Sequence, residues 1–179
     1  MLPMEIERQR NGANLIHFAS GFELIPTMMT SPYALTKRIA SEMLEGKAHI
    51  VYLYTIFGGN YEPGFRFVGS LVRAAVNGLP YTCTAPFSTR DFVHIDHLLD
   101  LVGKLVTTKD YRSVQLGTGN ARTLAQVVGT LEGIMGHSLS VKFMYVGADY
   151  FEYSATDPHL KHDTFIEDLT NEYARRCNE

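Results

Sequence analysis

The 179-residue sequence contains no tryptophan, only two cysteines and no long apolar run. Cys83 and Cys177 lie far apart and outside any Cys-x-x-Cys motif, so neither a disulfide framework nor a zinc knuckle is expected. Unpaired cysteines fit a reducing compartment, and we expect a cytoplasmic protein. No segment reaches the roughly 20 apolar residues that cross a bilayer, and the first twelve residues lack the apolar core of a signal peptide. No membrane role is expected.

An excess of charge of either sign is also missing. Sixteen basic and 19 acidic residues leave a formal net charge of -3, with no basic block that would bind a nucleic-acid backbone. We therefore expect a small-molecule substrate or a protein partner. The length and the 45% hydrophobic content are typical of a single ordinary domain, here taken as residues 1–179.

Apolar runs alternate with helical patterns, which predicts an α/β fold. A compact run at 14–19 reads as a strand buried on both faces, a helix follows at 32–45, and 48–54 is a second β-favouring run. Pro32 opens the helix and Gly46 follows it. The side chains expected to face inward from this helix are Leu35, Ile39, Met43 and Leu44.

The rest of the chain continues the alternation. Further strands are expected at 79–83, 92–95, 111–116 and 140–146. Further helices are expected at 65–77, 98–107, 123–135 and 165–176. Asp96 is expected to cap the N-terminus of the helix at 98–107, and Thr123 that of the helix ending at 135. Residues 4–11 read as the end of a surface helix, and 147–162 as irregular.

Tyr33 and Lys37 lie one helical turn apart and share a helix face. Tyrosine is too weak an acid for work near neutral pH, but a fixed cation beside it favours the phenolate, which can pass a proton at a sugar hydroxyl or carbonyl. Ser20 ends the first apolar run, thirteen residues before Tyr33, where a hydroxyl at a strand's C-terminal end points into a ligand crevice. The alternatives are an ordinary solvated Tyr-Lys pair and a serine in a turn.

Arg90 is a further candidate, because a guanidinium fork suits a diphosphate; its alternative is a salt bridge to Asp91. The group His94, Asp96, His97 and Asp100 superficially resembles a set of metal ligands. If 92–95 is a strand, these side chains do not converge, and no metal is expected. Gly117-Thr118-Gly119 lacks the third glycine of a phosphate loop, which favours a tight strand-to-helix turn.

Four motifs in order resemble the extended short-chain dehydrogenase/reductases, the NAD-dependent epimerases, dehydratases and reductases of nucleotide sugars. The motifs are Ser20 with Tyr33-Ala34-Leu35-Thr36-Lys37, Tyr54-Thr55-Ile56-Phe57-Gly58-Gly59, Thr89-Arg90-Asp91-Phe92-Val93-His94-Ile95-Asp96, and the segment 116–124. The resemblance covers roughly residues 14–136. It implies a truncated Rossmann-like parallel sheet at 14–56 and 111–146, with a small substrate-binding lobe mainly at 57–110.

The resemblance also implies roles for individual residues. Tyr33 would be the general acid/base, Lys37 would assist it and hold the nicotinamide ribose of NAD or NADP, and Ser20 would orient the substrate. Arg90 would bind the diphosphate of a nucleotide-sugar substrate. Thr55 stands where related enzymes usually offer an asparagine toward the substrate, so the identity of the sugar is open.

The Gly-x-x-Gly-x-x-Gly turn with which the family holds the dinucleotide pyrophosphate does not occur in these 179 residues. The resemblance therefore implies a truncated family member or a cofactor half on another chain, with weak or no NAD(P) binding by this chain alone. We expect a homodimer, through an apolar trace at Ala34, Ile39, Ala40 and Met43, or a partner chain that covers an exposed sheet edge. The alternative function is a non-catalytic scaffold or protein-interaction module.

Overall fold

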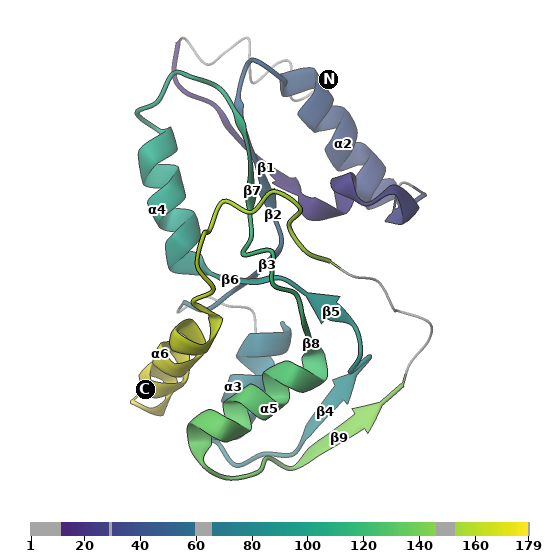
Figure 1. Ribbon diagram of the computed structural model, residues 1–179, viewed down its shortest axis with the longest axis vertical. Helices are drawn as coiled ribbons and strands as arrows, with labels where there is room; N and C mark the ends of the chain where they lie inside the picture. Colours follow the sequence, from purple (N-terminus) through teal and green to yellow (C-terminus); the bar gives the residue numbers. More distant parts are fainter. Residues whose placement is uncertain (1–11, 29, 60–65, 146–152, 179) are drawn as a thin grey trace.

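The computed structural model describes residues 12–28, 30–59, 66–145 and 153–178. Within them the elements form two lobes, one around a parallel sheet and one around three helices, with short strands between the lobes (Figure 1). The helix expected at 4–11 lies outside the described residues. No helix in the described part is long and apolar enough to span a membrane.

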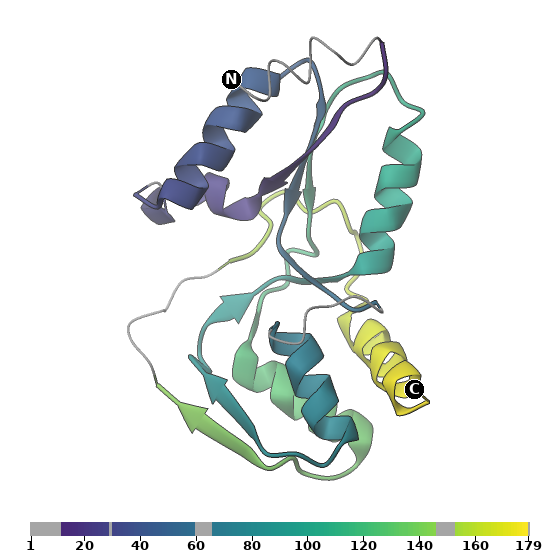
Figure 2. The same cartoon turned by 180° about the vertical axis from the view of Figure 1, so that it is seen from behind.

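The first lobe is a three-stranded parallel sheet with a helix on each side. Its strands are β1 (Ile16–Ser20), β2 (His49–Leu53) and β7 (Ser113–Leu116), in the order β1-β2-β7. Helix α2 (Pro32–Leu44) joins β1 to β2, which confirms the predicted strand–helix–strand unit. Helix α4 (Ile95–Leu105) lies on the opposite side of the sheet from α2 (Figure 2).

The two faces of this sheet are packed differently. On the α4 side, Val51 of β2 and Leu116 of β7 form a buried apolar cluster with Leu101 and Leu105. The expectation that the first strand is buried on both faces was wrong, because Phe18 of β1 is largely exposed. In the described residues β1 pairs only with β2, so it is an edge strand of this sheet.

The inward face of α2 also differs from the prediction. Leu35 and Ile39 are 46% and 47% exposed, whereas Ala34, Ser41 and Leu44 are buried. Small residues at Ala34 and Ser41 allow α2 to pack closely on β1, and Ser41 turns inward to meet a buried carboxylate. Of the expected inward stripe, Leu44 is buried as predicted, whereas Leu35 and Ile39 form an exposed apolar surface.

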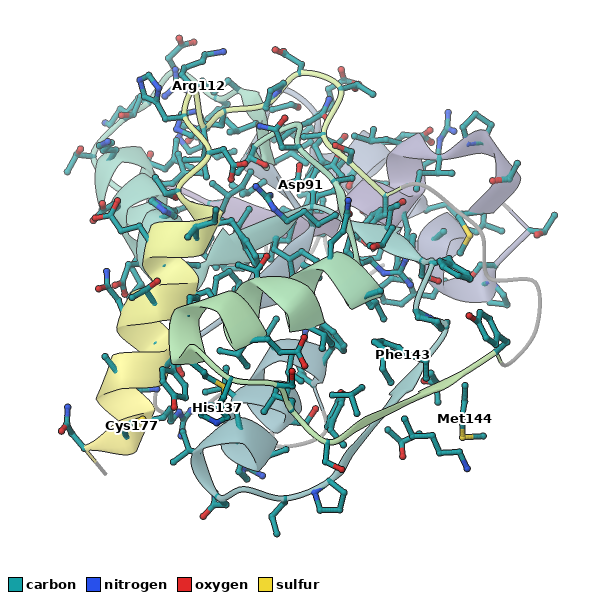
Figure 3. The ribbon with its side chains drawn as sticks, turned by 60° about the horizontal axis from the view of Figure 1, so that its bottom comes forward. Asp91, Arg112, His137, Phe143, Met144 and Cys177 are labelled. Atoms are coloured by element: carbon teal, nitrogen blue, oxygen red, sulfur yellow. The ribbon has the colours of Figure 1, made fainter. Side chains whose placement is uncertain are left out.

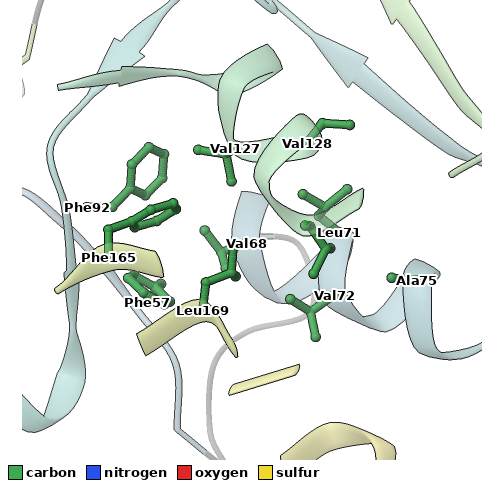
Figure 4. Close-up of a cluster of buried hydrophobic side chains, with 11 residues drawn as sticks. Phe57, Val68, Leu71, Val72, Ala75, Phe92, Val127, Val128, Phe165 and Leu169 are labelled. Atoms are coloured by element: carbon green, nitrogen blue, oxygen red, sulfur yellow. The ribbon is translucent and has the colours of Figure 1, made fainter. Parts of the chain in front are cut away.

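The second lobe surrounds the largest apolar core. Helices α3 (Phe67–Val76), α5 (Leu124–Met135) and α6 (Phe165–Cys177) contribute Leu71, Leu131 and Leu169 to it. Figure 4 shows the aromatic end of this core, where Phe57, Phe92 and Phe165 meet at centroid distances of 5.4 to 6.5 Å. Strand β4 (Tyr81–Thr84) pairs in parallel with β9 (Val141–Met144) at the outer side of this lobe.

Short strands between the lobes carry two candidate site residues. Strand β3 (Thr55–Phe57) pairs in parallel with β6 (Phe92–His94), and β5 (Thr89–Arg90) pairs antiparallel with β8 (Arg122–Thr123). Thr55 follows β2 almost directly, and Arg90 ends β5. Both residues therefore lie where the sheet lobe meets the helical lobe.

The packing divides the chain differently from the expected segments. Helix α4, inside the expected lobe segment 57–110, packs on the sheet. Helix α5, inside the expected sheet segment 111–146, packs in the core of the second lobe. The assignment of the second lobe to substrate binding stays a prediction.

One of the two predicted caps is confirmed. Thr123 caps α5: its hydroxyl accepts a hydrogen bond from the Gln126 amide at 3.1 Å, and the Gln126 side chain accepts one from the Thr123 amide. The cap at Asp96 was wrong. Strand β6 runs directly into α4, so the helix begins at Ile95, and His94 accepts from the Asp96 amide.

Candidate functional site

A cavity of about 1000 Å³ lies at the C-terminal ends of β1 and β2. All five residues singled out in the sequence line it: Ser20, Tyr33, Lys37, Thr55 and Arg90. They come from the end of β1, the start of α2, the start of β3 and the end of β5. The crevice beyond the carboxyl ends of parallel strands is the usual ligand site of an open α/β sheet.

Ser20 belongs to both β1 and the turn that follows it. It caps the 3₁₀ helix η1 (Gly21–Leu24): its Oγ accepts from the Phe22 amide at 3.3 Å, and its own amide donates to Glu23 Oε1 at 2.7 Å. The side chain is buried on the cavity wall. Ser20 Oγ also shares a hydrogen bond with the Tyr153 hydroxyl, so a ligand oxygen receives the Ser20 proton only in place of Tyr153.

Tyr33 and Lys37 lie in the first half of α2, on one face of the helix. Tyr33 is 54% exposed at the cavity wall, with the ring of Phe22 edge-on to it at 6.4 Å. The Lys37 ammonium donates to the backbone carbonyl of Phe18 in β1 at 2.8 Å. Lys37 is therefore fixed to the strand that ends in Ser20.

Arg90 and Asp91 are adjacent in sequence and serve different parts of the molecule. Arg90 is half-buried, lines the cavity and donates from Nη1 to the Thr89 carbonyl at 2.8 Å. Asp91, labelled in Figure 3, is fully buried, and its carboxylate accepts hydrogen bonds of 2.8 to 3.1 Å from Thr118, Gly119 and Ala155.

The Gly117-Thr118-Gly119 segment forms the tight turn that the sequence predicted. The anion that it binds belongs to the protein itself, the carboxylate of Asp91. Gly119 has a φ of +76°, a conformation that glycine adopts without strain. A Cβ at Gly117 would lie 2.6 Å from Asp91 Oδ2. The glycines therefore bring the backbone close to this carboxylate and hold β5 and β6 against β7.

Three aromatic residues at the cavity were not among the predicted site residues, although Tyr54 belongs to one of the four motifs. The Tyr153 hydroxyl donates to the Leu53 carbonyl at 2.9 Å, its ring stacks on Phe22 at 4.3 Å, and Tyr54 lies 4.9 Å from it. Burial raises the pKa of Tyr153 to about 12, although a hydrogen bond with Ser20 acts in the opposite direction. Burial also raises the pKa of Tyr54. Both phenols therefore stay neutral near neutral pH.

An ionic cluster around the buried carboxylate of Glu172 also borders the cavity. The Glu172 carboxylate of α6 accepts from Arg175 at 2.6 Å, from Arg176 at 3.0 Å and from the Gly59 amide at 3.3 Å, and lies 3.9 Å from His94 Nε2. Burial alone would raise the pKa of Glu172, but hydrogen bonds from His94, Arg175 and Arg176 lower it to about 2. The hydrogen bond to Glu172 raises the pKa of His94.

Of the four residues that superficially resembled metal ligands, His94 and Asp96 are in contact, with Nδ1 3.4 Å from Oδ2, whereas His97 has other partners. His94 lies beside Glu172, whereas His97 Nε2 lies 3.1 Å from Asp168 and 3.0 Å from the Thr164 hydroxyl. Over the described ranges, no group of three His, Cys, Asp or Glu side chains is arranged to hold a metal ion.

Solved structures share this architecture. UDP-N-acetylglucosamine 4-epimerase from Methanobrevibacter ruminantium M1, in complex with UDP-N-acetylmuramic acid, is similar with a TM-score of 0.77 at 16% identity over 98% of this chain and 66% of that one. UDP-glucuronic acid 4-epimerase from Bacillus cereus, in complex with UDP-glucuronic acid and NAD, has a TM-score of 0.73 at 18% identity over 97% of this chain and 65% of that one. dTDP-glucose 4,6-dehydratase from Bacillus anthracis, in complex with NAD, has a TM-score of 0.73 at 15% identity over 97% of this chain and 64% of that one.

No protein-family model matches the chain. The chain spans just under two thirds of the length of the three enzymes. Over that length the chain shares the fold of these enzymes, which confirms the α/β fold with a parallel sheet that the sequence predicted. The chain has a Rossmann-like α/β fold, which it shares with these nucleotide-sugar epimerases and this dehydratase.

Proposed function

We propose that the chain forms the substrate-binding and acid/base part of a nucleotide-sugar epimerase, dehydratase or reductase that works with NAD or NADP. One observation carries this proposal: Ser20, Tyr33, Lys37, Thr55 and Arg90, from four separate segments, line a single cavity. The cavity volume of about 1000 Å³ is at the upper end of the range for small-molecule sites.

The acid/base end comprises Tyr33, Lys37 and Ser20. The Tyr33 phenol exchanges a proton with the reacting sugar oxygen, and the Ser20 hydroxyl donates a hydrogen bond to the same oxygen. An ammonium has three donors, and one of those of Lys37 is bound to Phe18, which leaves the others for ribose hydroxyls. A nicotinamide dinucleotide, when bound, supplies the hydride chemistry.

The phosphate-binding residue is Arg90, and Thr55 also lines the cavity. A guanidinium has five donors in a planar fork, a geometry that suits the oxygens of a diphosphate, and Arg90 lines the cavity with its Nη1 bound to the Thr89 carbonyl. The Thr55 hydroxyl offers one donor and two acceptors to the sugar.

The charge of the cavity wall also favours an anionic ligand. Its cationic side chains are Lys37, Arg66, Arg90 and Arg175, and its carboxylates are Asp96 and Glu172. Glu172 is bound by Arg175, Arg176 and His94. A positive wall concentrates anions such as a nucleoside diphosphate.

The test is titration of the 179-residue chain with UDP-glucose and NAD, separately and together, followed by calorimetry and by absorbance of reduced nicotinamide. Saturable UDP-glucose binding that Arg90→Ala weakens supports the proposal. UDP-glucose binding that Arg90→Ala leaves unchanged favours the alternative of a non-catalytic scaffold. No binding of UDP-glucose contradicts the proposal and favours a protein-interaction module. Cytoplasmic location stays a prediction.

A further inference from the structure

The carboxylate of Glu23 is buried between the turn that carries Ser20 and the helix that carries Tyr33 and Lys37. Only 4% of Glu23 is exposed. Its Oε1 accepts from the Ser20 amide at 2.7 Å, and its Oε2 accepts from the Ser41 hydroxyl of α2, also at 2.7 Å. One side chain thus binds two elements that the chain connects only through residues 21–31.

Two kinds of contact hold this turn in place, the packing of Gly21 and the polar link of Glu23 to α2. Gly21 packs against two buried rings, since a Cβ there would lie 2.7 Å from Tyr54 and 3.0 Å from Tyr153. The Ser41 hydroxyl lies one helical turn beyond Lys37 and also contacts the Lys37 carbonyl at 3.2 Å. The turn is therefore fixed between the aromatic wall on one side and the Glu23–Ser41 contact on the other.

Hydrogen bonds to a carboxylate are stronger than those between neutral groups, and buried bonds are exchanged with water less readily. The distance between Ser20 and the Tyr33–Lys37 face of α2 decides whether both hydroxyls reach one sugar oxygen. A misplacement of about 1 Å is enough to impair such a site.

We propose that Glu23 is a positioning residue, which holds the Ser20 turn on helix α2 so that Ser20, Tyr33 and Lys37 converge on one substrate oxygen. This inference rests on the proposed function for the identity of the substrate. It adds a residue that does not line the main cavity and acts through Ser20 and Ser41.

The first experiment measures affinities of UDP and UDP-glucose by calorimetry in Glu23→Ala, Glu23→Gln and Ser41→Ala. UDP lacks the glucose, so its affinity measures the binding of the diphosphate at Arg90. The ratio of the UDP-glucose affinity to the UDP affinity measures the additional binding of the sugar. Glu23→Ala should lower that ratio about tenfold, the value of one hydrogen bond, with a smaller loss in Ser41→Ala. Glutamine keeps an acceptor for the Ser20 amide and a polar partner for Ser41, so Glu23→Gln should restore most of the ratio.

Two controls separate positioning from general damage. Gln126→Ala removes the equivalent side-chain bond of the α5 capping box and should leave the ratio unchanged. In a Ser20→Ala background, Glu23→Ala should lower the ratio no further, because Glu23 acts through Ser20. An equal further loss in that background would overturn the inference.

The second experiment needs no ligand and therefore remains informative if the proposed function fails. Hydrogen exchange of the Ser20 and Phe22 amides is compared between wild type, Ser41→Ala and Gln126→Ala. Ser41→Ala should accelerate exchange at these amides about tenfold, because one hydrogen bond that holds the turn is lost. Unchanged protection in Ser41→Ala would show that the contact does not hold the turn and would overturn the inference. Absence of UDP and UDP-glucose binding with accelerated exchange would overturn only the proposed function.

Discussion

The Lys37 ammonium donates a 2.8 Å hydrogen bond to the Phe18 carbonyl, two residues before Ser20. This contact fixes α2 to β1, which is an edge strand of its sheet in the described part of the chain. It also gives a hydrogen-bond donor to a backbone carbonyl of that strand, because an edge strand has backbone groups that no neighbouring strand pairs with. Lys37 therefore contributes to the structure of the site before any ligand is bound.

For the cofactor we predict that the 179-residue chain binds NAD or NADP no better than millimolar. Tyr33 and Lys37 offer contacts only to the nicotinamide ribose, and the sequence contains no glycine-rich turn for the pyrophosphate. Those contacts must overcome at least about 4 kcal/mol of lost rigid-body freedom. Calorimetry with each dinucleotide checks this, and a micromolar Kd would contradict it.

For the phosphate end we predict that Arg90→Ala weakens binding of UDP and UDP-glucose alike by about 1.5 to 3 kcal/mol, the range for a hydrogen bond to a charged group. Arg38→Ala is the matched control, because Arg38 forms an exposed ion pair with Glu42 and does not line the main cavity. Equal affinities for the two variants would show that Arg90 is structural.

For assembly we predict a homodimer that forms through α2. Of the residues in the expected apolar trace, Ala34 is buried within the chain, whereas Ile39 is exposed beside Leu35. An exposed apolar helix surface is typical of an interface. Light scattering at micromolar concentration should report a dimer, and the double substitution Leu35→Lys with Ile39→Lys should convert it to a monomer. A monomeric wild-type protein would contradict the predicted dimer.

For stability against pH we predict a loss on acidification that depends on Glu172. Its pKa is lowered in the folded state from 4.5 to about 2, so its contribution is fully present above 4.5 and is lost as the pH falls toward 2. The pKa of His94 is raised, so its contribution is present below 6.5 and is lost as the pH rises through the folded-state value.

Urea unfolding between pH 3 and pH 8 measures this dependence. At pH 6, Glu172→Gln should lower the free energy of unfolding by about 3 kcal/mol, because it leaves the partly buried Arg175 and Arg176 without their charged partner. It should also flatten the profile below 4.5. Glu167→Gln, at an exposed position of the same helix, should do neither. If the free energy of unfolding changed with pH in parallel for wild type and Glu172→Gln, the assignment of the acid-induced loss to Glu172 would be contradicted.

The parts of the fold that local sequence determines were predictable. The strand–helix–strand unit around α2 and the Thr123 cap of α5 depend on apolar runs and on a hydroxyl at the right position. The five cavity residues were found because each belongs to a short motif with a fixed place on a strand end or a helix start.

The parts that depend on distant contacts were not predictable. Tyr153 reaches the cavity from a segment without helix or strand, through a hydrogen bond to Leu53. Glu172 reaches it from the last helix. The inward face of α2 was misjudged because the carboxylate of Glu23 turns Ser41, rather than Leu35, toward the sheet. No local pattern records these tertiary pairings.

The central claim is that one cavity binds a nucleotide sugar, with its phosphate end at Arg90 and its sugar end at Ser20. The most direct test is a two-dimensional NMR titration of the isotope-labelled 179-residue chain with UDP-glucose. We predict saturable chemical-shift changes at the amides of Ser20, Tyr33, Thr55 and Arg90, with UDP alone shifting Arg90 but not Ser20. Absence of any change, or changes confined to β4 and β9 on the outer side of the second lobe, would contradict the account.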